Sequence, residues 1–367
     1  MKTAIVHYWL VNMRGGEKML EALLEMFPDA DIYTHVYDPD AVSAIIKSRK
    51  IFTSYVNGLP FAKKLYRLFM PLMPSALVDF DLRQYDLVIS SEAGPAKGVI
   101  PNPNAYHLCY CHSPMRYLWD MYHEYFRGTN PFVRYFMKRL MPTLRVWDIT
   151  SANLVDRFVT NSAYTAKRIR RVYNRDADVV YGPAPIERYL NVERTPKDHY
   201  LFFGQITGYK RLDLAIEACV RSGRKLVVAG AGAKKREIKK HEKTGLVRFA
   251  GRVSDEEAAA LFAGARALLY PGIEDLGLVP IEANAAGCPV IAFRDGGALD
   301  TVKENVTGIF FDEQSPASLI GALDRFESME AKGFFHNREA FAGHVRQFSP
   351  DAFKERVRRI IEERKRV

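Results

Sequence analysis

The sequence predicts an α/β protein with two doubly wound domains, each built on a parallel sheet. From residue 200 onward, short apolar runs rich in Val, Leu and Phe alternate with amphipathic helical patterns, and the first half shows a less regular version. Runs that are apolar throughout are typical of strands covered on both faces. With 367 residues, 48% of them hydrophobic, the chain can form two cores.

In the first half, six runs are predicted strands and a helix follows the first of them, from about residue 15 to 27. The six runs are AIVHY (4–8), DIYTHV (31–36), YDLVIS (85–90), HLCYC (107–111), RFVTNS (157–162) and ADVVYG (177–182).

In the second half, strands and helices alternate. The predicted strands are 200–204, 225–230, 247–251, 266–271 and 289–293, and the predicted helices are 212–223, 231–245, 256–265 and 278–287.

Three prolines and no sustained period mark residues 183–197 as a linker. We therefore expect an N-terminal domain over 1–185 and a second domain over 186–349. The charged helix 350–367 either caps the second domain or crosses back to the first. Sheets of this kind bind ligands at the carboxyl ends of their strands, so we expect the domains to face each other across a cleft.

The net charge of +10 favours an anionic partner: nucleic acid, an acidic lipid surface or a phosphorylated small molecule. No helix-turn-helix, zinc or RNP-like pattern accompanies the charge, so nucleic acid is not expected. The cysteines, Cys109, Cys111, Cys219 and Cys288, form no disulfide framework and indicate a cytoplasmic protein. We expect no signal peptide and no membrane-spanning segment.

Two acid-free segments, LPFAKKLYRLFMPLMPSAL (59–77) and NPFVRYFMKRLMPTLRVW (130–147), mix aliphatic and aromatic residues with Lys and Arg. Interfacial helices on anionic lipid have this composition. They predict peripheral binding to a membrane surface. The alternative is that the apolar residues pack inward and the cations are simply solvated.

Lys210 and Arg211 stand where a strand gives way to a helix, in the segment GQITGYKRLDL. Positive charge at a helix N-terminus opposes the helix dipole and is usually kept for a ligand. A phosphate leaving group needs such cations, because it gains charge as its bond to carbon breaks. Solvated side chains at a helix start are the alternative.

Two glutamates flank a predicted helix start in YPGIEDLGLVPIEANAAG: Glu274 precedes it and Glu282 lies within the helix. Gly277 and Pro280 mark the start, whose free amides suit a diphosphate. The glutamates are then placed to accept hydrogen bonds from hydroxyl groups on either side of that diphosphate. A nucleotide sugar has this layout.

These segments, with VVAGAG, FAGRVSDEEAAALFAGA and TGIFF, resemble the donor domain of the retaining glycosyltransferases of family 4, which have the GT-B fold. Glu274 and Glu282 match the family's E-x7-E motif. In the first half, RGGEKMLEAL resembles the acceptor-side glycine-rich loop, and CHSPMRYLWD resembles the segment with the family's active-site histidine. The resemblance is nearest to bacterial mannosyltransferases of O-antigen and exopolysaccharide synthesis.

The resemblance implies that Lys210 binds the donor diphosphate, Glu274 the sugar hydroxyls and Glu282 the ribose, with His112 beside the anomeric carbon. It adds backbone and side-chain contacts to the donor and an acceptor or phosphate side. The donor contacts are Gly204, Arg211, Gly230, Leu276, Gly277 and Leu278, and the acceptor or phosphate side comprises Arg14, Gly15, Gly16 and Arg116. Gln205 departs from the family, many members of which have an arginine there, and Arg211 or Arg14 is expected to replace it.

The implied activity is transfer of a hexose, by best match mannose from GDP-mannose, to a lipid-linked oligosaccharide on the inner face of the cytoplasmic membrane. Neither metal nor cofactor is implied, and a UDP-sugar donor is the alternative. A dinucleotide-binding oxidoreductase is a distant one: Gly230 and Gly232 form a GxG, but Lys235 occupies the third glycine position.

Overall fold

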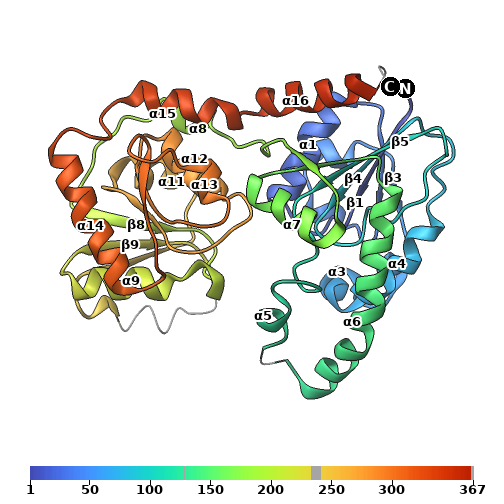
Figure 1. Ribbon diagram of the computed structural model, residues 1–367, viewed down its shortest axis with the longest axis horizontal. Helices are drawn as coiled ribbons and strands as arrows, with labels where there is room; N and C mark the ends of the chain where they lie inside the picture. The colour runs from blue at the N-terminus through green and yellow to red at the C-terminus, as the bar shows by residue number, and fades with distance from the viewer. Residues whose placement is uncertain (128, 233–240, 365–367) are drawn as a thin grey trace. The chain divides into compact units, whose positions relative to one another are not determined.

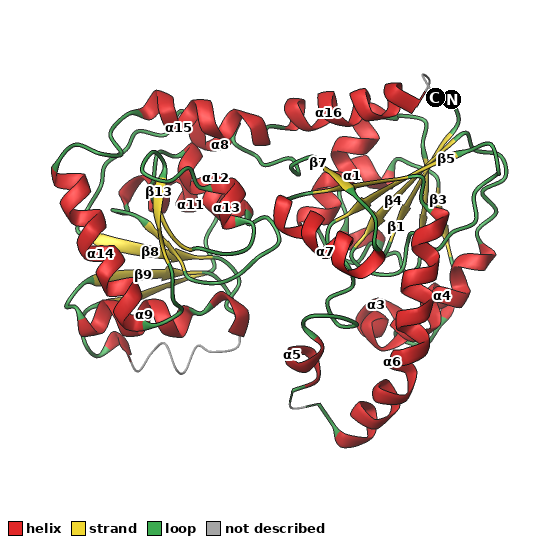
Figure 2. Ribbon diagram, in the orientation of Figure 1, coloured by secondary structure: helices red, strands yellow, loops and turns green. Residues whose placement is uncertain are grey.

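The computed structural model describes residues 1–127, 129–232 and 241–364. The chain forms two compact units, one of Met1–Gly182 completed by residues from Arg356 onward and one of Pro183–Glu355 (Figure 1). In each unit the strands lie at the centre with helices around them (Figure 2).

The first unit contains a seven-stranded sheet in the order β3-β2-β1-β4-β5-β6-β7, and every pairing is parallel. The order reverses at β1 and β4, which is the switch point of a doubly wound fold. Its strands are β1 (Thr3–His7), β2 (Asp31–Thr34), β3 (Ile51–Thr53), β4 (Leu87–Glu92), β5 (Tyr106–Cys111), β6 (Arg157–Thr160) and β7 (Ala177–Val179). The six predicted strands are confirmed, whereas β3 was not predicted.

The helices of the first unit differ widely in length. They are α1 (Gly15–Met26), α2 (Ala44–Lys47), α3 (Ala62–Leu65), α4 (Met73–Ala76), α5 (Tyr122–Phe126), α6 (Pro131–Ser151) and α7 (Ala163–Tyr173). The segment 59–77 is not one interfacial helix but a series of short turns, with a 3-10 helix at Tyr66–Leu72 between α3 and α4. Pro71 and Pro74 lack the amide hydrogen that a continuous helix needs.

The predicted helix of 130–147 is confirmed as α6. Its C-terminal half is anchored by Asp148, which accepts hydrogen bonds from Trp119 Nε1 at 2.7 Å and from Tyr173 and pairs with Lys97. Lys97 also pairs with Glu92 at 2.7 Å, and all three charged side chains are fully buried. Burying charges together is tolerated only when they are paired, so this cluster fixes α6 to the sheet.

The second unit contains a six-stranded parallel sheet in the order β10-β9-β8-β11-β12-β13. Its strands are β8 (His199–Phe203), β9 (Lys225–Ala229), β10 (Val247–Gly251), β11 (Leu268–Tyr270), β12 (Val290–Phe293) and β13 (Gly308–Phe311). Its helices are α8 (Glu187–Leu190), α9 (Leu212–Arg221), α11 (Asp255–Gly264), α12 (Leu278–Ala285), α13 (Ala298–Thr301), α14 (Pro316–Ala331) and α15 (Arg338–Val345).

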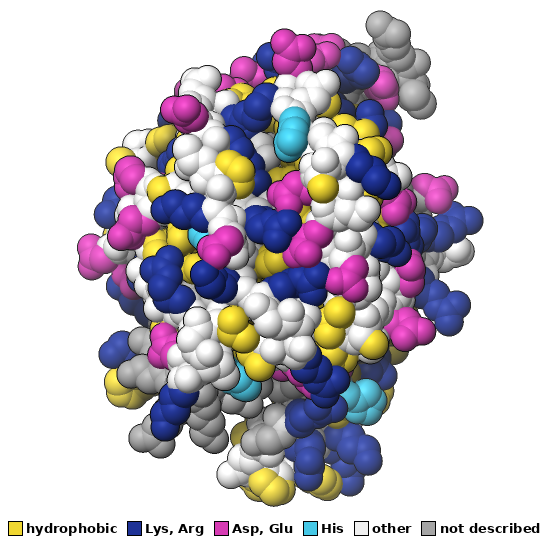
Figure 3. Space-filling model, turned by 90° about the vertical axis from the view of Figure 1, so that its left-hand side faces the viewer, with side chains coloured by type: hydrophobic (Ala, Val, Ile, Leu, Met, Phe, Trp, Pro, Cys, Tyr) yellow, Lys and Arg dark blue, Asp and Glu magenta, His cyan; other side chains and the backbone are white. Residues whose placement is uncertain are grey.

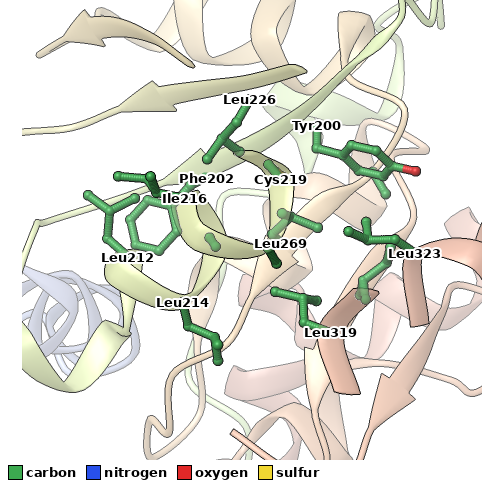
Figure 4. Close-up of a cluster of buried hydrophobic side chains, with 14 of the residues drawn as sticks. Tyr200, Phe202, Leu212, Leu214, Ile216, Cys219, Leu226, Leu269, Leu319 and Leu323 are labelled. Carbon is green, nitrogen blue, oxygen red and sulfur yellow. The ribbon is translucent and has the colours of Figure 1, made fainter. Parts of the chain in front are cut away.

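The core of the second unit lies between its sheet and the helices α9 and α14 (Figure 4). Phe202 and Leu269 from the strands meet Leu212 of α9 and Leu319 of α14, all of them buried. The predicted strands of this half are confirmed. Most of the predicted helix 231–245 falls on residues 233–240, which lie outside the described part of the chain.

The helix α16 (Pro350–Glu363) runs through residue 355, where the second unit ends and the first resumes. Its later residues complete the first unit. Val357 and Ile360 are buried, and Arg157 NH1 of β6 donates to Glu363 Oε2 at 2.8 Å.

Candidate active site

In the second unit, two glycines bring the ends of β8 and β9 together. Gly204 and Gly230 have φ values of +127° and +144°, in a region that side chains rarely adopt. A Cβ on Gly230 would overlap the carbonyl oxygen of Gly204. The loops at the carboxyl edge of this sheet therefore approach more closely than any other residue type would allow.

Lys210 lies over this glycine turn and is buried, with its side chain about 10% exposed. A Cβ on Gly204 would stand 3.0 Å from Lys210 Nζ, and Nζ pairs with Glu274 Oε1 at 2.9 Å. The structure therefore joins the cation after β8 to the carboxylate after β11. In such a pair the lysine can donate hydrogen bonds to an anion, and the carboxylate beside it can accept one from a hydroxyl group of the same ligand.

The loop that carries Glu274 is held from both sides by close backbone approaches. A Cβ on Gly272 would stand 2.6 Å from Lys210 Cα, and one on Gly296 would stand 2.7 Å from the Glu274 carbonyl oxygen. The amide of Gly297 donates to that same carbonyl at 2.8 Å. Glu274 is thus positioned by backbone, which restricts its movement when a ligand binds.

Gly277 opens α12 with φ +83°. A Cβ there would overlap the hydroxyl of Tyr270, so the turn needs glycine. The first amides of a helix have no intrahelical partner and carry partial positive charge. Here they belong to Leu278 and Val279, and Pro280 follows without an amide hydrogen. Leu276 is buried just before them. The predicted anion site thus lies at a genuine helix start.

Glu282 lies one turn into α12. Burial raises the pKa of its carboxyl to about 7, Asp255 adds to the rise, and Arg188 and Lys210 lower it. The carboxyl is therefore poised between its charged and neutral forms near neutral pH. In both forms it accepts a hydrogen bond from a hydroxyl group.

Arg211 has other partners than Lys210, which pairs with Glu274. It adopts a left-handed conformation, φ 52°, and its Nε donates to Asp213 Oδ2 at 3.1 Å and its NH1 to Gln314 Oε1 at 3.5 Å. Gln205 is exposed. The charge of Arg211 at the start of α9 is thus balanced by Asp213 in the first turn, a partner that the sequence interpretation did not consider.

In the first unit, His112 follows β5 and begins a buried chain across three neighbouring strands. Its Nε2 lies 3.0 Å from Ser91 Oγ on β4, and Ser91 Oγ lies 2.9 Å from His7 Nδ1 on β1. His7 Nε2 in turn lies 3.8 Å from Glu17 Oε1 in the first turn of α1. The side chains of His7 and Glu17 are 0% and 1% exposed.

Electrostatics decides which group donates and which accepts in each hydrogen bond between Glu17 and His112. Burial alone would raise the pKa of the Glu17 carboxyl, but His7 and the amides of Glu17 and Arg14 hold it below its ordinary value. The carboxylate therefore favours a proton on His7 Nε2, which leaves His7 Nδ1 as an acceptor. Ser91 has a single proton to give, so it donates to His7 and accepts from His112 Nε2.

His112 is then neutral with its proton on Nε2 and a lone pair on Nδ1. Burial lowers its pKa to about 3, with a further contribution from His7 that Glu17 opposes. A neutral imidazole with a fixed acceptor nitrogen suits the binding of a hydroxyl group better than proton transfer at neutral pH.

The other residues predicted on the acceptor side lie in two places. Arg14 precedes α1 and its amide donates to Glu17 Oε2 at 2.8 Å, while Gly15 and Gly16 are the first residues of α1. Arg116 lies in the loop after β5, where its NH1 approaches Met121 Sδ at 3.6 Å. The structure thus links the predicted glycine loop to His112 through Glu17.

Sequence reasoning did not single out His7, Ser91 or Glu17. His7 ends the predicted strand 4–8, and Glu17 belongs to the quoted RGGEK, so both were visible without an assigned role. Ser91 carries no signal, because its role arises only from strand register: it pairs with His7 across β1 and β4.

Among the described residues, no group of three or more His, Cys, Asp and Glu side chains is placed to hold a metal ion.

Comparison with solved structures identifies the fold as GT-B. Anabaena Alr3699/HepE in complex with UDP superposes with a TM-score of 0.69, covering 99% of this chain and 100% of that one, at 15% identity. The lipopolysaccharide outer core galactosyltransferase WaaB in its apo form gives 0.69 at 16% identity, over 99% and 100% of the two chains. These two similarities concern the fold alone.

Residues 187–342 match the family model of the glycosyl transferases group 1. Alpha-1,3/1,6-mannosyltransferase ALG2 of Homo sapiens is 29% identical over 269 residues, 62% of this chain and 63% of the relative. The same enzyme of Mus musculus is 27% identical, over 58% and 59%. The chain thus spans less than two thirds of the length of these curated relatives.

We expect Glu17→Gln to weaken the tautomer preference of His112, because a neutral amide can either donate to His7 or accept from it. The measurement is ¹⁵N NMR of labelled histidine, in which the wild-type His112 should show a protonated Nε2. Glu21→Gln is the matched control, since Glu21 lies on the same helix and pairs with Lys18. An Nδ1-protonated ring in the wild type, or no change in Glu17→Gln, would contradict the direction assigned to the chain.

Proposed function

We propose that the protein is a retaining glycosyltransferase of family 4 that transfers a hexose from a nucleotide sugar to a lipid-linked saccharide in bacterial surface polysaccharide synthesis. The observation that carries this proposal is the ion pair of Lys210 and Glu274, held by glycine turns beside the start of α12. It places a cation, free amides and a hydroxyl acceptor together, within the segment that matches group 1 glycosyl transferases.

In this proposal Lys210 and the amides of Leu278 and Val279 stabilise the charge that builds up on the leaving diphosphate. Glu274 orients the transferred sugar, and Glu282 accepts from a ribose hydroxyl. His112 accepts from a hydroxyl of the same sugar through Nδ1. The leaving phosphate takes the acceptor's proton, so the reaction proceeds on one face of the sugar and retains its configuration. No metal is needed.

Mannose from GDP-mannose is the proposed donor, supported by the mannosyltransferase names of two curated relatives. A UDP-sugar is the second candidate, because the solved structures of similar fold include Alr3699/HepE in complex with UDP and with UDP-glucose. The two donors share the diphosphate and the sugar hydroxyls and differ in the base.

We also propose that the protein is cytoplasmic and binds peripherally to the inner face of the cytoplasmic membrane. No helix in the described residues has the length and apolar character that crossing a bilayer requires. Support for surface binding comes from α6, the first ten residues of which include no buried side chain. On the face of the second unit seen in Figure 3, by contrast, cationic and acidic side chains are interspersed.

The deciding experiment is a thermal-shift series with GDP, UDP, ADP and NAD, followed by a transfer assay with the sugar form of the stabilising nucleotide. GDP should raise the melting temperature most, and transfer should persist in EDTA. A response to UDP alone would replace GDP-mannose by a UDP-sugar as the donor. A response to NAD alone would contradict the proposal and favour a dinucleotide-binding oxidoreductase.

A further inference from the structure

A cavity of about 420 Å³ lies in the first unit, and its lining includes none of His112, Ser91, His7 and Glu17. Its walls come from the loop after β5, from α6 and from α7. They consist of Trp119, Asp120, Arg145, Tyr164, Arg168, Arg171 and Val172. The volume suits a small organic ligand.

Three guanidinium groups face a single carboxylate here. Arg168 is committed to the protein, since its NH2 donates to Asp120 Oδ1 at 2.6 Å and its NH1 to Ser113 Oγ at 2.8 Å. Arg145 uses only its Nε, which donates to the Leu118 carbonyl at 2.7 Å. The side chain of Arg171 makes no hydrogen bond or ion pair with any residue that the structure describes. The cavity therefore carries net positive charge and has donors to spare.

The donors are held in place by aromatic rings. The guanidinium of Arg145 lies 5.5 Å from the ring centre of Trp119 and 5.7 Å from that of Tyr122. Arg168 lies 5.9 Å from the ring centre of Tyr164. Stacked guanidinium groups lose little conformational freedom when they bind an oxyanion, and they bind phosphate through two hydrogen bonds at once.

From Arg145, α6 runs back towards Pro131 as an exposed and acid-free surface. The helix has 21 residues, so it is about 30 Å long. Its large exposed hydrophobic side chains are Phe132, Tyr135, Phe136, Leu140, Val146 and Ile149. Arg134, Lys138 and Arg139 are exposed among them. A hydrocarbon chain attached to an anion in the cavity would find an apolar track on the same helix.

We propose that this cavity binds the diphosphate of the lipid-linked acceptor, whose hydrocarbon chain follows α6. The inference rests on the proposed function, of which it names the acceptor site. Two partly unused guanidinium groups match a diphosphate, and the adjoining helix matches a lipid. The hydrogen bond between Arg168 and Asp120 keeps this wall of the cavity rigid. The saccharide beyond the diphosphate remains outside the cavity.

The test is calorimetric titration with farnesyl diphosphate, a soluble isoprenoid diphosphate, without a sugar donor. Arg171→Ala is the diagnostic variant, because the exposed Arg171 supports no other side chain. Arg170→Ala is the matched control, since Arg170 is its neighbour on α7 and pairs with Asp176 at 3.0 Å. We expect Arg171→Ala to weaken binding at least about tenfold and Arg170→Ala to change it less than about twofold.

Two further probes separate the sources of the anion. Inorganic pyrophosphate should bind more weakly than farnesyl diphosphate; equal binding would overturn the lipid assignment. If phosphatidylglycerol vesicles bind through Arg171 and farnesyl diphosphate does not, the cavity is a headgroup site and the proposal fails. It also fails if GDP or UDP binding is lost in Arg171→Ala and kept in Lys210→Ala. Because none of these titrations involves transfer, an absent transferase activity leaves their result readable.

Discussion

Lys210→Ala and Glu274→Gln are each expected to reduce sugar transfer by at least about 100-fold, the scale on which a fixed group that stabilises transition-state charge acts. The reason differs between the two. In the proposed site Lys210 binds the diphosphate, so its loss should weaken the binding of both the free nucleotide diphosphate and the nucleotide sugar. In the proposed site Glu274 binds the sugar, so Glu274→Gln should weaken binding of the nucleotide sugar and leave binding of the free nucleotide nearly unchanged.

Calorimetry with both ligands, beside a product assay, measures this difference. Lys225→Ala is the matched control, because Lys225 is an exposed lysine of the same unit that pairs with Asp198 at 2.6 Å. Circular dichroism should show an unchanged fold in all three variants. Near-normal turnover in either site variant would rule out the proposed roles. If Glu274→Gln weakened the binding of both ligands equally, Glu274 would be assigned to the diphosphate instead of the sugar.

The second large effect is loss of the first unit's stability in mild acid. Burial lowers the pKa of His35 and of His107 to about 4 and that of His112 to about 3. Each of these histidines binds a proton less readily in the folded than in the unfolded chain. Stability is therefore complete above the unfolded pKa of about 6.5 and falls as the pH drops towards 4.

In that window each histidine costs about 1.4 kcal/mol per pH unit, so the three together cost roughly 4 kcal/mol per unit. A domain is stable by only about 5 to 15 kcal/mol, so the first unit should lose a large part of its stability between pH 6.5 and pH 5. In the second unit Glu282 acts with the opposite sign, because its raised pKa stabilises the folded form as the pH falls through 7. It offsets His199 and His344, whose pKa values burial lowers.

Tryptophan fluorescence reads the first unit selectively, since Trp9, Trp119 and Trp147 all belong to it. Urea titrations at pH 7.5, 6.0 and 5.0 should show its midpoint falling steeply. His107→Gln should reduce the slope by about a third, as one of three histidines is removed. His123→Gln, at an exposed position, should leave the slope unchanged. A midpoint independent of pH would refute the prediction.

Much of the architecture was predictable because buried parallel strands are short continuous apolar runs. Every strand was predicted except β3 in the first unit and β13 in the second, and Gly204 and Gly277 were expected at a strand end and a helix start. The close approach of Gly230 to Gly204 was not, since it joins residues 26 positions apart that only the β8–β9 pairing brings together.

The candidate site was predictable only in part. Lys210 and Glu274 were both singled out, each for its own strand end, but their ion pair depends on which strands are neighbours. Ser91 shows the limit more sharply. A serine in an apolar strand has no distinguishing pattern, and its position between His7 and His112 follows from the register of β1, β4 and β5. Arg211 was expected to bind a phosphate. In the structure it donates to Asp213, an acidic residue that stands only two positions later in the sequence.

The helix α16 has a consequence for biosynthesis. Domains usually fold in the order in which the ribosome releases them. Here Val357 and Ile360 of α16 are buried, and Arg364 donates to the carbonyl oxygens of Asp86 and Asn104 in the first unit. The first unit therefore cannot complete its fold until α16 has been synthesised. Part of its apolar surface stays exposed while the whole second unit is being made. In a nascent chain, the domain begun first is the one completed last.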